Sequence, residues 1–342
     1  MGEPPCTRYE AQSSVEAARP AQTAAIHGLA GALGGLANIL VFHPLDTVKT
    51  RLQAAERAIA VGFGKDVSRG WLRSRSRTLD TLMHIRRTEG VRALYNGLFP
   101  AMLGGTLSWS FYFYWYNMGK QYARDLGFAP TPASHFMIAT SAGAITAVLT
   151  NPIWVVKTRM QLESMRECPA SALASSAAAP AQRPYFSFFD GMRCILHTEG
   201  VQGLYRGLIP SLWLVSQGAL QFVVYEECKR WLLARRAVDY AQSLAVSLSV
   251  PESLVAATTS KLVASLTTYP LQVVRTRMQK RGVDPARYGS LHLAVTSILR
   301  NEGVLGFYKG MTANIMRVTP SAAVTFVVYE SVVGAYFRIA GA

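Results

Sequence analysis

Two short phrases occur three times along this chain, always in the same order. The first surrounds a proline and reads HPLDTVKTRLQ (43–53), NPIWVVKTRMQ (151–161) and YPLQVVRTRMQ (269–279). The second reads EGVRALYNG (89–97), EGVQGLYRG (199–207) and EGVLGFYKG (302–310). Repetition at a fixed period constrains a fold strongly, because every copy is expected to form the same local structure. We therefore expect a tandem triplication of a unit of about a hundred residues.

Each unit contains two apolar segments separated by a polar, basic loop, and each segment is long enough to cross a bilayer, which takes about 20 residues for ~30 Å of hydrocarbon. The first segments are 25–52, 134–160 and 252–278, and the second are 97–122, 207–233 and 310–337. In the first segment, Gly31 and Gly35 form a GxxxG pair that would let helices approach closely. We expect an all-α membrane protein with a disordered tail over 1–24 and three repeats over 25–122, 134–233 and 252–337. Each repeat would hold two transmembrane helices and a short amphipathic helix, such as 79–87 or 291–300.

The composition argues against two other classes of protein. Half of the residues are apolar, only 16% are charged, and the net charge is +15. The Lys and Arg residues stand at the ends of apolar segments, without a motif that reads RNA or DNA, so we expect no nucleic-acid partner. No catalytic, metal-ligand or cofactor-binding pattern occurs, so we expect neither an enzyme nor a bound metal or cofactor.

The loop charges predict an orientation. The loop at 54–96 carries nine Lys and Arg against four Asp and Glu, whereas 121–133 carries one of each. The positive-inside rule places the long basic loops on the more negative side of the membrane. We expect a multi-pass protein of the mitochondrial inner membrane with these loops in the matrix, and the plastid inner envelope is the alternative location.

The proline phrase predicts a bent helix with a charged face. A proline inside a helix removes one backbone hydrogen bond and bends the helix. The residues two and five positions after the proline share one helix face, and in the first copy they are Asp46 and Lys49. With threefold pseudo-symmetry, the +2 residue of one unit can meet the +5 base of the next. Such a ring would close one end of a central cavity.

The frame PxDxxKxR, its partner EGxxxLYxG and the triplication resemble the mitochondrial carrier family over about residues 24–337. The resemblance implies a six-helix pseudo-threefold barrel around a cavity that opens to each side in turn. It also implies a matrix gate of three facing pairs with a glutamine beneath each: Asp46–Lys157, Trp154–Arg275 and Gln272–Lys49, with Gln53, Gln161 and Gln279. The first pair alone is ionic, because Trp154 and Gln272 stand where the family places acids.

The resemblance implies a second gate at the far end of the second membrane helix of each repeat, where the family carries a Tyr-acid-x-x-base motif. This cytoplasmic gate reads YNMGK (116–120), YEECK (225–229) and YESVV (329–333). Its residues are Tyr116, Asn117, Lys120, Tyr225, Glu226, Lys229, Tyr329 and Glu330. Glu330–Lys120 would be its complete ion pair, Asn117–Lys229 could form a hydrogen bond, and Glu226 would face Val333.

Two cations deep in the apolar segments mark a candidate substrate site. Charged residues within membrane helices are functional candidates by default, and Lys261 and Arg317 have no obvious acidic partner at their depth. We interpret them as anion-binding, and the alternative is that they snorkel or pair structurally. The resemblance adds the solute-contact positions seven and eight residues after the last glycine of each second phrase: Gly104, Gly105, Leu214 and Val318. Neighbouring polar and aromatic residues extend the site: Gln217, Gln221, Asn314 and Trp109. The position of Leu214 is provisional, because Gly207 to Glu226 spans 19 residues where Gly97 to Asn117 spans 20.

Cations beside aromatic faces suit a solute with a flat heteroaromatic ring and carboxylates or phosphates. The segments LSWSFYFYWYN (107–117) and YKGMTANIMRVTP (308–320), with Trp154 and Gln272, resemble the folate/flavin-dinucleotide branch of the family. We therefore expect a monomeric carrier of folate or flavin adenine dinucleotide (FAD) in contact with the lipid bilayer and a bound anionic lipid. Pyrimidine nucleotides and nicotinamide adenine dinucleotide (NAD) are alternative solutes, and a membrane scaffold or receptor is the alternative class.

Overall fold

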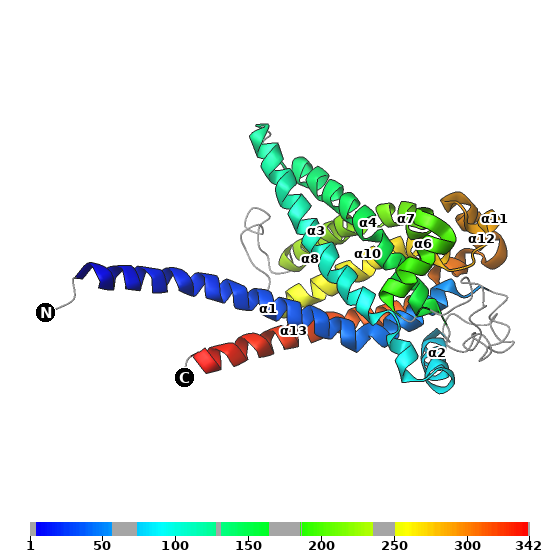
Figure 1. Cartoon of the computed structure of the whole chain (residues 1–342), viewed down its shortest axis with the longest axis horizontal. Helices are drawn as coiled ribbons and strands as arrows, with labels where there is room; N and C mark the ends of the chain where they lie inside the picture. Colours follow the sequence, from blue (N-terminus) through cyan, green and yellow to red (C-terminus); the bar gives the residue numbers. More distant parts are fainter. Residues whose placement is uncertain are drawn as a thin grey trace. The chain divides into compact units, whose positions relative to one another are not determined.

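The computed structural model describes residues 5–56, 74–127, 131–163, 185, 187–234 and 250–340. Within these residues every regular element is a helix, which confirms the predicted all-α class. The long helices (Figure 1) are α1 (Pro5–Ala54), α3 (Leu98–Asp125), α4 (Pro132–Leu162), α7 and α8 in succession (Leu208–Trp213 and Ser216–Ala234), α10 (Val250–Gln279) and α13 (Met311–Ala340). Shorter elements stand between them: α2 (Ser74–Thr88), η3 (Val91–Tyr95), α6 (Phe188–Leu204), α11 (Pro285–Tyr288), α12 (Leu291–Glu302) and η4 (Val304–Tyr308). The predicted order of elements is therefore present in each repeat.

Three stretches of helix among the described residues are long and apolar enough to cross a membrane by length and composition: Ser134–Leu162, Leu208–Ala234 and Val304–Tyr336. The other long helices, α1, α3 and α10, fall outside this set. Tyr and Trp side chains in α3, and Lys261 with Ser and Thr residues in α10, make these helices less apolar. Side chains of this kind are expected on helices that face a polar interior rather than lipid alone.

The chain divides into two compact units, which are described separately. One unit consists of the chain up to Phe42 and from Thr319 onward, and it contains the first part of α1 and the second part of α13. A Cβ atom added to Gly34 would lie 3.0 Å from the backbone oxygen of Thr325, so glycine allows this close helix contact. The Asn38 amide donates a hydrogen bond of 2.9 Å to the Ser321 hydroxyl.

Two expectations for this unit differ from the structure. Cβ atoms added to Gly31 and Gly35 would meet no described atom within 4 Å, so the close contact of α1 uses Gly34 instead. GxxxG spacing puts two glycines on one face, but it does not say which face meets a neighbour. The tail predicted to be disordered over 1–24 is helical from Pro5 onward, in keeping with its Ala, Glu and Gln residues, which have high helix propensity.

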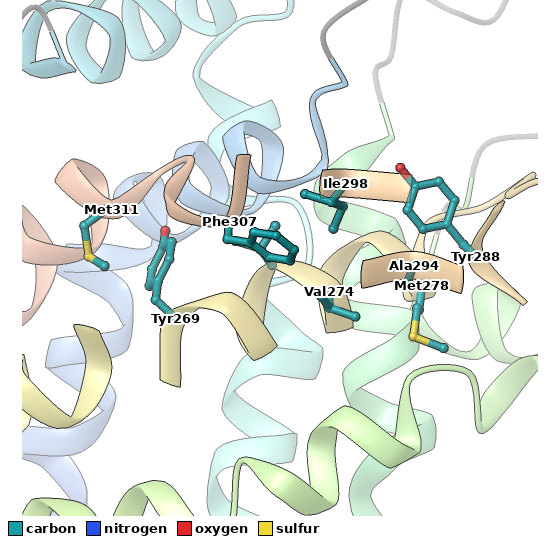
Figure 2. Close-up of a cluster of buried hydrophobic side chains, with 9 residues drawn as sticks. Tyr269, Val274, Met278, Tyr288, Ala294, Ile298, Phe307 and Met311 are labelled. Carbon is teal, nitrogen blue, oxygen red and sulfur yellow. The ribbon is translucent and has the colours of Figure 1, made fainter. Parts of the chain in front are cut away.

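The other unit, His43–Val318, contains three similar hydrophobic cores, one for each repeat. Each core joins a valine four residues after the proline, an isoleucine four residues before the glutamate of the second phrase, and a large apolar residue five residues after that glutamate. These are Val48, Ile85 and Leu94; Val156, Ile195 and Leu204; and Val274, Ile298 and Phe307. Figure 2 shows the third core, where Val274 of α10, Ile298 of α12 and Phe307 of η4 converge. The two phrases recur because each pair of phrases builds one core.

The residue before each proline forms a hydrogen bond to the turn that precedes the second apolar segment of its own repeat. The His43 ring lies 3.1 Å from the Asn96 carbonyl oxygen, the Asn151 amide donates to the Leu204 carbonyl at 2.8 Å, and the Tyr269 hydroxyl donates to the Lys309 carbonyl at 3.0 Å. Three different side chains thus make one kind of bond. His43 has a structural role here, as a buried residue stacked on Tyr95.

Candidate functional site

We call the contact between two neighbouring repeats at the matrix gate a seam. The first seam lies between the first and second repeats. Asp46 of α1 and Lys157 of α4 form the predicted ion pair. Gln161, one helical turn beyond Lys157, donates from its amide nitrogen to the same Asp46 carboxylate oxygen at 3.0 Å, and its amide oxygen accepts from the Thr50 hydroxyl at 2.9 Å. Every polar group of Gln161 is therefore used, and the carboxylate organises this seam.

The seam between the third and first repeats has the same layout without a carboxylate. The Lys49 ammonium donates to the Gln272 amide oxygen at 2.9 Å and lies 5.6 Å from the centre of the Tyr269 ring. Beneath them, the Thr276 hydroxyl donates to the Gln53 amide oxygen at 2.9 Å. The Gln53 amide also lies near the Tyr269 hydroxyl. Neutral amides and an aromatic ring thus surround the Lys49 charge.

In the seam between the second and third repeats, no acceptor among the described residues pairs with the base, Arg275. Trp154 lies against α3, where a Cβ atom on Gly104 would be 3.5 Å from two atoms of the indole ring. The Lys157 ammonium is 5.6 Å from the centre of the same ring. Beneath, the Gln279 amide oxygen accepts from the Thr158 hydroxyl at 2.9 Å, but the amide nitrogen of Gln279 and the Nε atom of Arg275 are buried without a hydrogen-bond partner.

Arg317 lies at the same level, and here an expectation from the sequence is wrong. We expected this cation to have no acidic partner, but its Nε atom is 3.9 Å from a carboxylate oxygen of Asp46. Counting residues along α13 gives the depth of the backbone and misses the reach of a long side chain across to α1. Lys49, Lys157 and Arg317 are close enough to interact electrostatically with the Asp46 carboxylate, and Arg275 is close enough to Lys49 to repel it. Lys261 is close enough to be repelled by Arg317, so the region carries a large excess of positive charge.

Two residues of the predicted substrate site pack between helices. The Asn314 amide donates to the Ser265 hydroxyl at 2.8 Å, and only 1% of Asn314 is exposed. Val318 is also buried. This geometry supports a role in joining α10 to α13 and gives no support to a solute contact for Asn314.

An aromatic ladder lies on α3, on the same helix face as Gly105. Trp109 and Tyr112 make an edge contact with ring centres 6.3 Å apart, and Tyr112 stacks on Tyr116 at 6.0 Å. The spacings of four, three and four residues from Gly105 to Trp109, Tyr112 and Tyr116 place them along one stripe. Gly104, beside this stripe, is where Trp154 packs.

The contact level of the second repeat falls at a break between α7 and α8, at Leu214 and Val215. Here the backbone bonds span three residues, from Val215 to Leu212, from Gln217 to Leu214 and from Gly218 to Val215. The break lies in the segment that is one residue shorter than its counterparts, so the helix accommodates the length difference locally, at Leu214 and Val215. Gln217 reaches the gate, since its amide oxygen is 3.5 Å from the Gln272 amide nitrogen. Gln221 is half-buried one turn further along α8.

Comparison with known proteins decides the family. A family model described as mitochondrial carrier protein matches residues 21–126, 129–236 and 246–339. The chain belongs to the mitochondrial carrier family. It is 38% identical over 313 residues to folate transporter 1, chloroplastic, of Arabidopsis thaliana, an alignment covering 89% of this chain and 92% of the relative.

Other relatives are carriers of nucleotides. The chain is 33% identical over 304 residues to nicotinamide adenine dinucleotide transporter 2, mitochondrial, of Arabidopsis thaliana, over 88% of this chain and 77% of the relative. It is 32% identical over 336 residues to a mitochondrial pyrimidine nucleotide transporter of Saccharomyces cerevisiae, over 90% of this chain and 85% of the relative. The predicted family and fold class are confirmed, and the relatives include all the nucleotide and folate classes expected above except FAD.

The cytoplasmic gate of this carrier is partly described. The Lys120 ammonium lies 5.5 Å from the centre of the Tyr116 ring, and the Tyr116 hydroxyl is 3.5 Å from the His135 ring. Among the described residues no hydrogen bond joins Asn117, which is exposed, to Lys229. Tyr329 and Glu330 belong to the other compact unit, so the predicted Glu330–Lys120 pair stays a prediction, as does the role of Tyr225 and Glu226. In the unit His43–Val318, the matrix gate is formed and this end lacks its predicted bond.

Three arginine–glutamate pairs that we did not anticipate surround the matrix gate of the carrier. The arginine seven residues after each proline forms two bonds to the glutamate of its own repeat: Arg51–Glu89 at 2.6 and 2.9 Å, Arg159–Glu199 at 2.7 and 2.8 Å, and Arg277–Glu302 at 3.0 and 2.8 Å. The Nε atom of each arginine also donates to a backbone carbonyl of another repeat, at Gln161, Gln279 and Gln53 in turn. Each pair thus ties a repeat to itself and to its neighbour. The signal was present in the sequence, because both charges recur in every copy of the phrases.

Proposed function

We propose that this protein is a transmembrane carrier that moves an anionic solute with a heteroaromatic ring, folate or FAD, across an organelle inner membrane by alternating access. The observation that carries the proposal is the charge of the region below the aromatic ladder. Lys49, Lys157 and Arg317 gather there around Asp46, Arg275 lies near Lys49, and Lys261 lies near Arg317. A dianionic solute would offset part of this net positive charge, and an aromatic stripe on α3 offers a surface for its ring.

The relatives support the solute class. The relative with 38% identity is named a folate transporter, and two others are named for NAD and pyrimidine nucleotides. All three solutes join a heteroaromatic ring to carboxylates or phosphates. Folate and FAD are the solutes we favour, and NAD and pyrimidine nucleotides are the alternatives within the same site. For the location we propose the mitochondrial inner membrane, with the plastid inner envelope as the alternative.

The test is uptake by liposomes that contain the purified protein. We expect labelled folate or FAD to accumulate inside, and we expect Lys261→Gln to reduce uptake by about tenfold or more, because a charged hydrogen bond is worth about 1.5–3 kcal/mol. Arg317→Gln should have a similar effect, but Arg317 also faces Asp46. Asp46→Asn is therefore the matched control, because it breaks the same contact while leaving both cations in place.

The outcomes separate the alternatives. Uptake of NAD or pyrimidine nucleotides alone would contradict the folate and FAD assignment and leave the carrier function standing. Absence of uptake for every solute, with a protein that binds them, would favour a receptor or scaffold.

A further inference from the structure

Among the three bases of the matrix gate, Arg275 alone has no partner in the described residues, although the Gln53 amide nitrogen and the Arg317 Nε atom are also buried without a hydrogen bond. Among the described residues its guanidinium makes no hydrogen bond or ion pair, and its Nε atom is fully buried. The equivalent base in the other seams has a partner, since Lys157 pairs with Asp46 and Lys49 donates to Gln272. A buried charge without a partner is costly in free energy, so a counter-ion from outside the chain would be strongly favoured here.

The Gln279 side chain gives separate evidence for a missing acceptor at this seam. It is 1% exposed, and its amide oxygen is fixed by the Thr158 hydroxyl, so the unpartnered group is the amide nitrogen. In the first seam the equivalent nitrogen, on Gln161, donates to the Asp46 carboxylate. By the pseudo-symmetry of the seams, the Gln279 nitrogen is oriented toward the position where an acid would stand if Trp154 were aspartate.

The indole ring of Trp154 supplies neither a negative charge nor a hydrogen-bond acceptor at this position. Its ring lies against Gly104 of α3 and under the Lys157 ammonium of its own helix. Among the described residues no hydrogen bond or cation–π contact joins Trp154 to Arg275. By this symmetry two donors, one of them cationic, face a position that no acceptor among the described residues occupies.

We propose that the anionic group of the transported solute, a carboxylate or a phosphate, binds to Arg275 and the Gln279 amide in the matrix gate and supplies the acid that this seam lacks. The inference rests on the proposed function, because it assumes an anionic solute. The inference extends the proposed function in one respect. The anionic end of the solute reaches the matrix gate itself, below the level of Lys261 and Gly104, and becomes part of the closed hydrogen-bond network of the gate. Arg275 is then a specificity-determining residue, which favours solutes with a free terminal anion.

The first experiment measures solute affinity of the full-length protein in detergent from the shift in thermal unfolding. The probes are folic acid and its pterin fragment 6-hydroxymethylpterin, which carries no carboxylate, and the corresponding pair UMP and uridine. Arg275→Gln is expected to weaken the binding of folic acid or UMP by about tenfold or more, the value of a charged hydrogen bond, and to leave the binding of 6-hydroxymethylpterin or uridine unchanged. Lys157→Gln removes one positive charge from the same gate and should weaken binding clearly less than Arg275→Gln does, because this base already has a carboxylate.

The second experiment asks whether the missing acid and the solute compete. Trp154→Asp keeps Arg275 and provides an internal acceptor, so it should weaken folic acid or UMP about as much as Arg275→Gln does. In the absence of solute, Arg275→Gln should leave the unfolding temperature unchanged or raise it, since it removes an unpaired charge. This result would not be expected of a residue that stabilises the fold.

Several results would overturn the inference. One is an equal loss of affinity in Arg275→Gln and Lys157→Gln, which would indicate a general effect of charge. Another is an unchanged affinity for both anionic probes in Arg275→Gln. A third is protection of the wild type by inorganic phosphate alone, at the same concentration as UMP and lost in Arg275→Gln, because the site would then hold a free anion and not the solute. Liposomes that take up folate while any of these holds would leave the proposed function intact.

Discussion

The pair of Arg277 and Glu302 allows a quantitative prediction about the stability of the matrix side. The Glu302 carboxylate accepts from Arg277 at 3.0 and 2.8 Å and from the Lys309 ammonium at 2.8 Å. Its side chain is 3% exposed and that of Arg277 is 2% exposed. Glu302→Gln would leave a buried guanidinium without its counter-charge. Breaking a buried pair in this way costs about 3–5 kcal/mol.

The equivalent pairs and an exposed pair provide a graded series of controls. In Arg159–Glu199 the glutamate is 17% exposed, so Glu199→Gln should cost less than Glu302→Gln. The pair of Arg230 and Glu227 is 49% and 64% exposed, so Glu227→Gln should cost about 0.5 kcal/mol or less. The measurement is the thermal unfolding of the detergent-solubilised protein by tryptophan fluorescence. At roughly 2 °C per kcal/mol, Glu302→Gln should lower the apparent Tm by about 6–10 °C and Glu227→Gln by about 1 °C.

The same pair predicts a pH dependence with a definite sign. Burial by itself would raise the pKa of Glu302, but hydrogen bonds from Arg277 and Lys309 outweigh it and hold the pKa below its ordinary value. A carboxyl group with a lowered folded pKa stabilises the protein above its unfolded pKa of about 4.3, and this contribution is lost as the pH falls further through the folded pKa. The wild type should therefore lose its advantage over Glu302→Gln below about pH 4. Equal Tm values for Glu302→Gln and Glu227→Gln at neutral pH would refute the reasoning.

Three further changes test other parts of the site. Gln272→Glu places a carboxylate beside the Lys49 ammonium, now 2.9 Å from the Gln272 amide oxygen, and should raise the apparent Tm by about 2 °C for one added partly buried pair while slowing uptake; a lower Tm would contradict this. Gly104→Val should abolish uptake while the protein still folds, because even a Cβ atom there would lie 3.1 Å from Ile153 and 3.5 Å from the Trp154 ring; normal uptake would show that Trp154 can move freely. Asp46→Asn leaves Lys157 and Arg317 without their shared carboxylate and should lower the apparent Tm by several degrees, about 6 °C for a loss of ~3 kcal/mol, in the same fluorescence assay; an unchanged Tm would mean that Gln161 and Thr50 alone hold the first seam.

Much of the fold follows from the sequence because the repeated phrases are local and each builds one core. Val48, Ile85 and Leu94 occupy fixed offsets from the proline and the glutamate, so the helix order and the packing of the short helices recur with the phrases. Two of the three predicted pairs, Asp46–Lys157 and Gln272–Lys49, also followed, since +2 and +5 positions lie on one face of each helix, whereas no described contact joins Trp154 to Arg275. What the sequence missed depends on side-chain reach across repeats. Arg317 meeting Asp46 is one case, and the donation from Arg277 to the Gln53 carbonyl is another.

The break between α7 and α8 shows how a length difference is accommodated. The second repeat is one residue short between Gly207 and Glu226, and three bonds, from Val215, Gln217 and Gly218, span three residues where an α-helix would span four. Such 3₁₀ geometry rises about 2.0 Å per residue, against about 1.5 Å in an α-helix, so three residues gain about 1.5 Å. That gain equals the rise of the missing residue. The sequence showed that a residue was missing, and only the structure shows that the helix keeps its length without it.

The arginine bridges have a consequence for the connectivity of the chain. Two of the three seams join repeats that follow one another in the sequence, whereas the seam between the third and first repeats has no peptide linkage across it. This seam is nevertheless bonded like the others: Arg277 donates to the Gln53 carbonyl at 3.0 Å, and Lys309 donates to the Ala55 carbonyl at 2.9 Å. The arginine bridges therefore do not distinguish the first repeat from the last. A circular permutant that begins at the second repeat would keep every bond of the gate, because cyclic order rather than starting point is what the interactions encode.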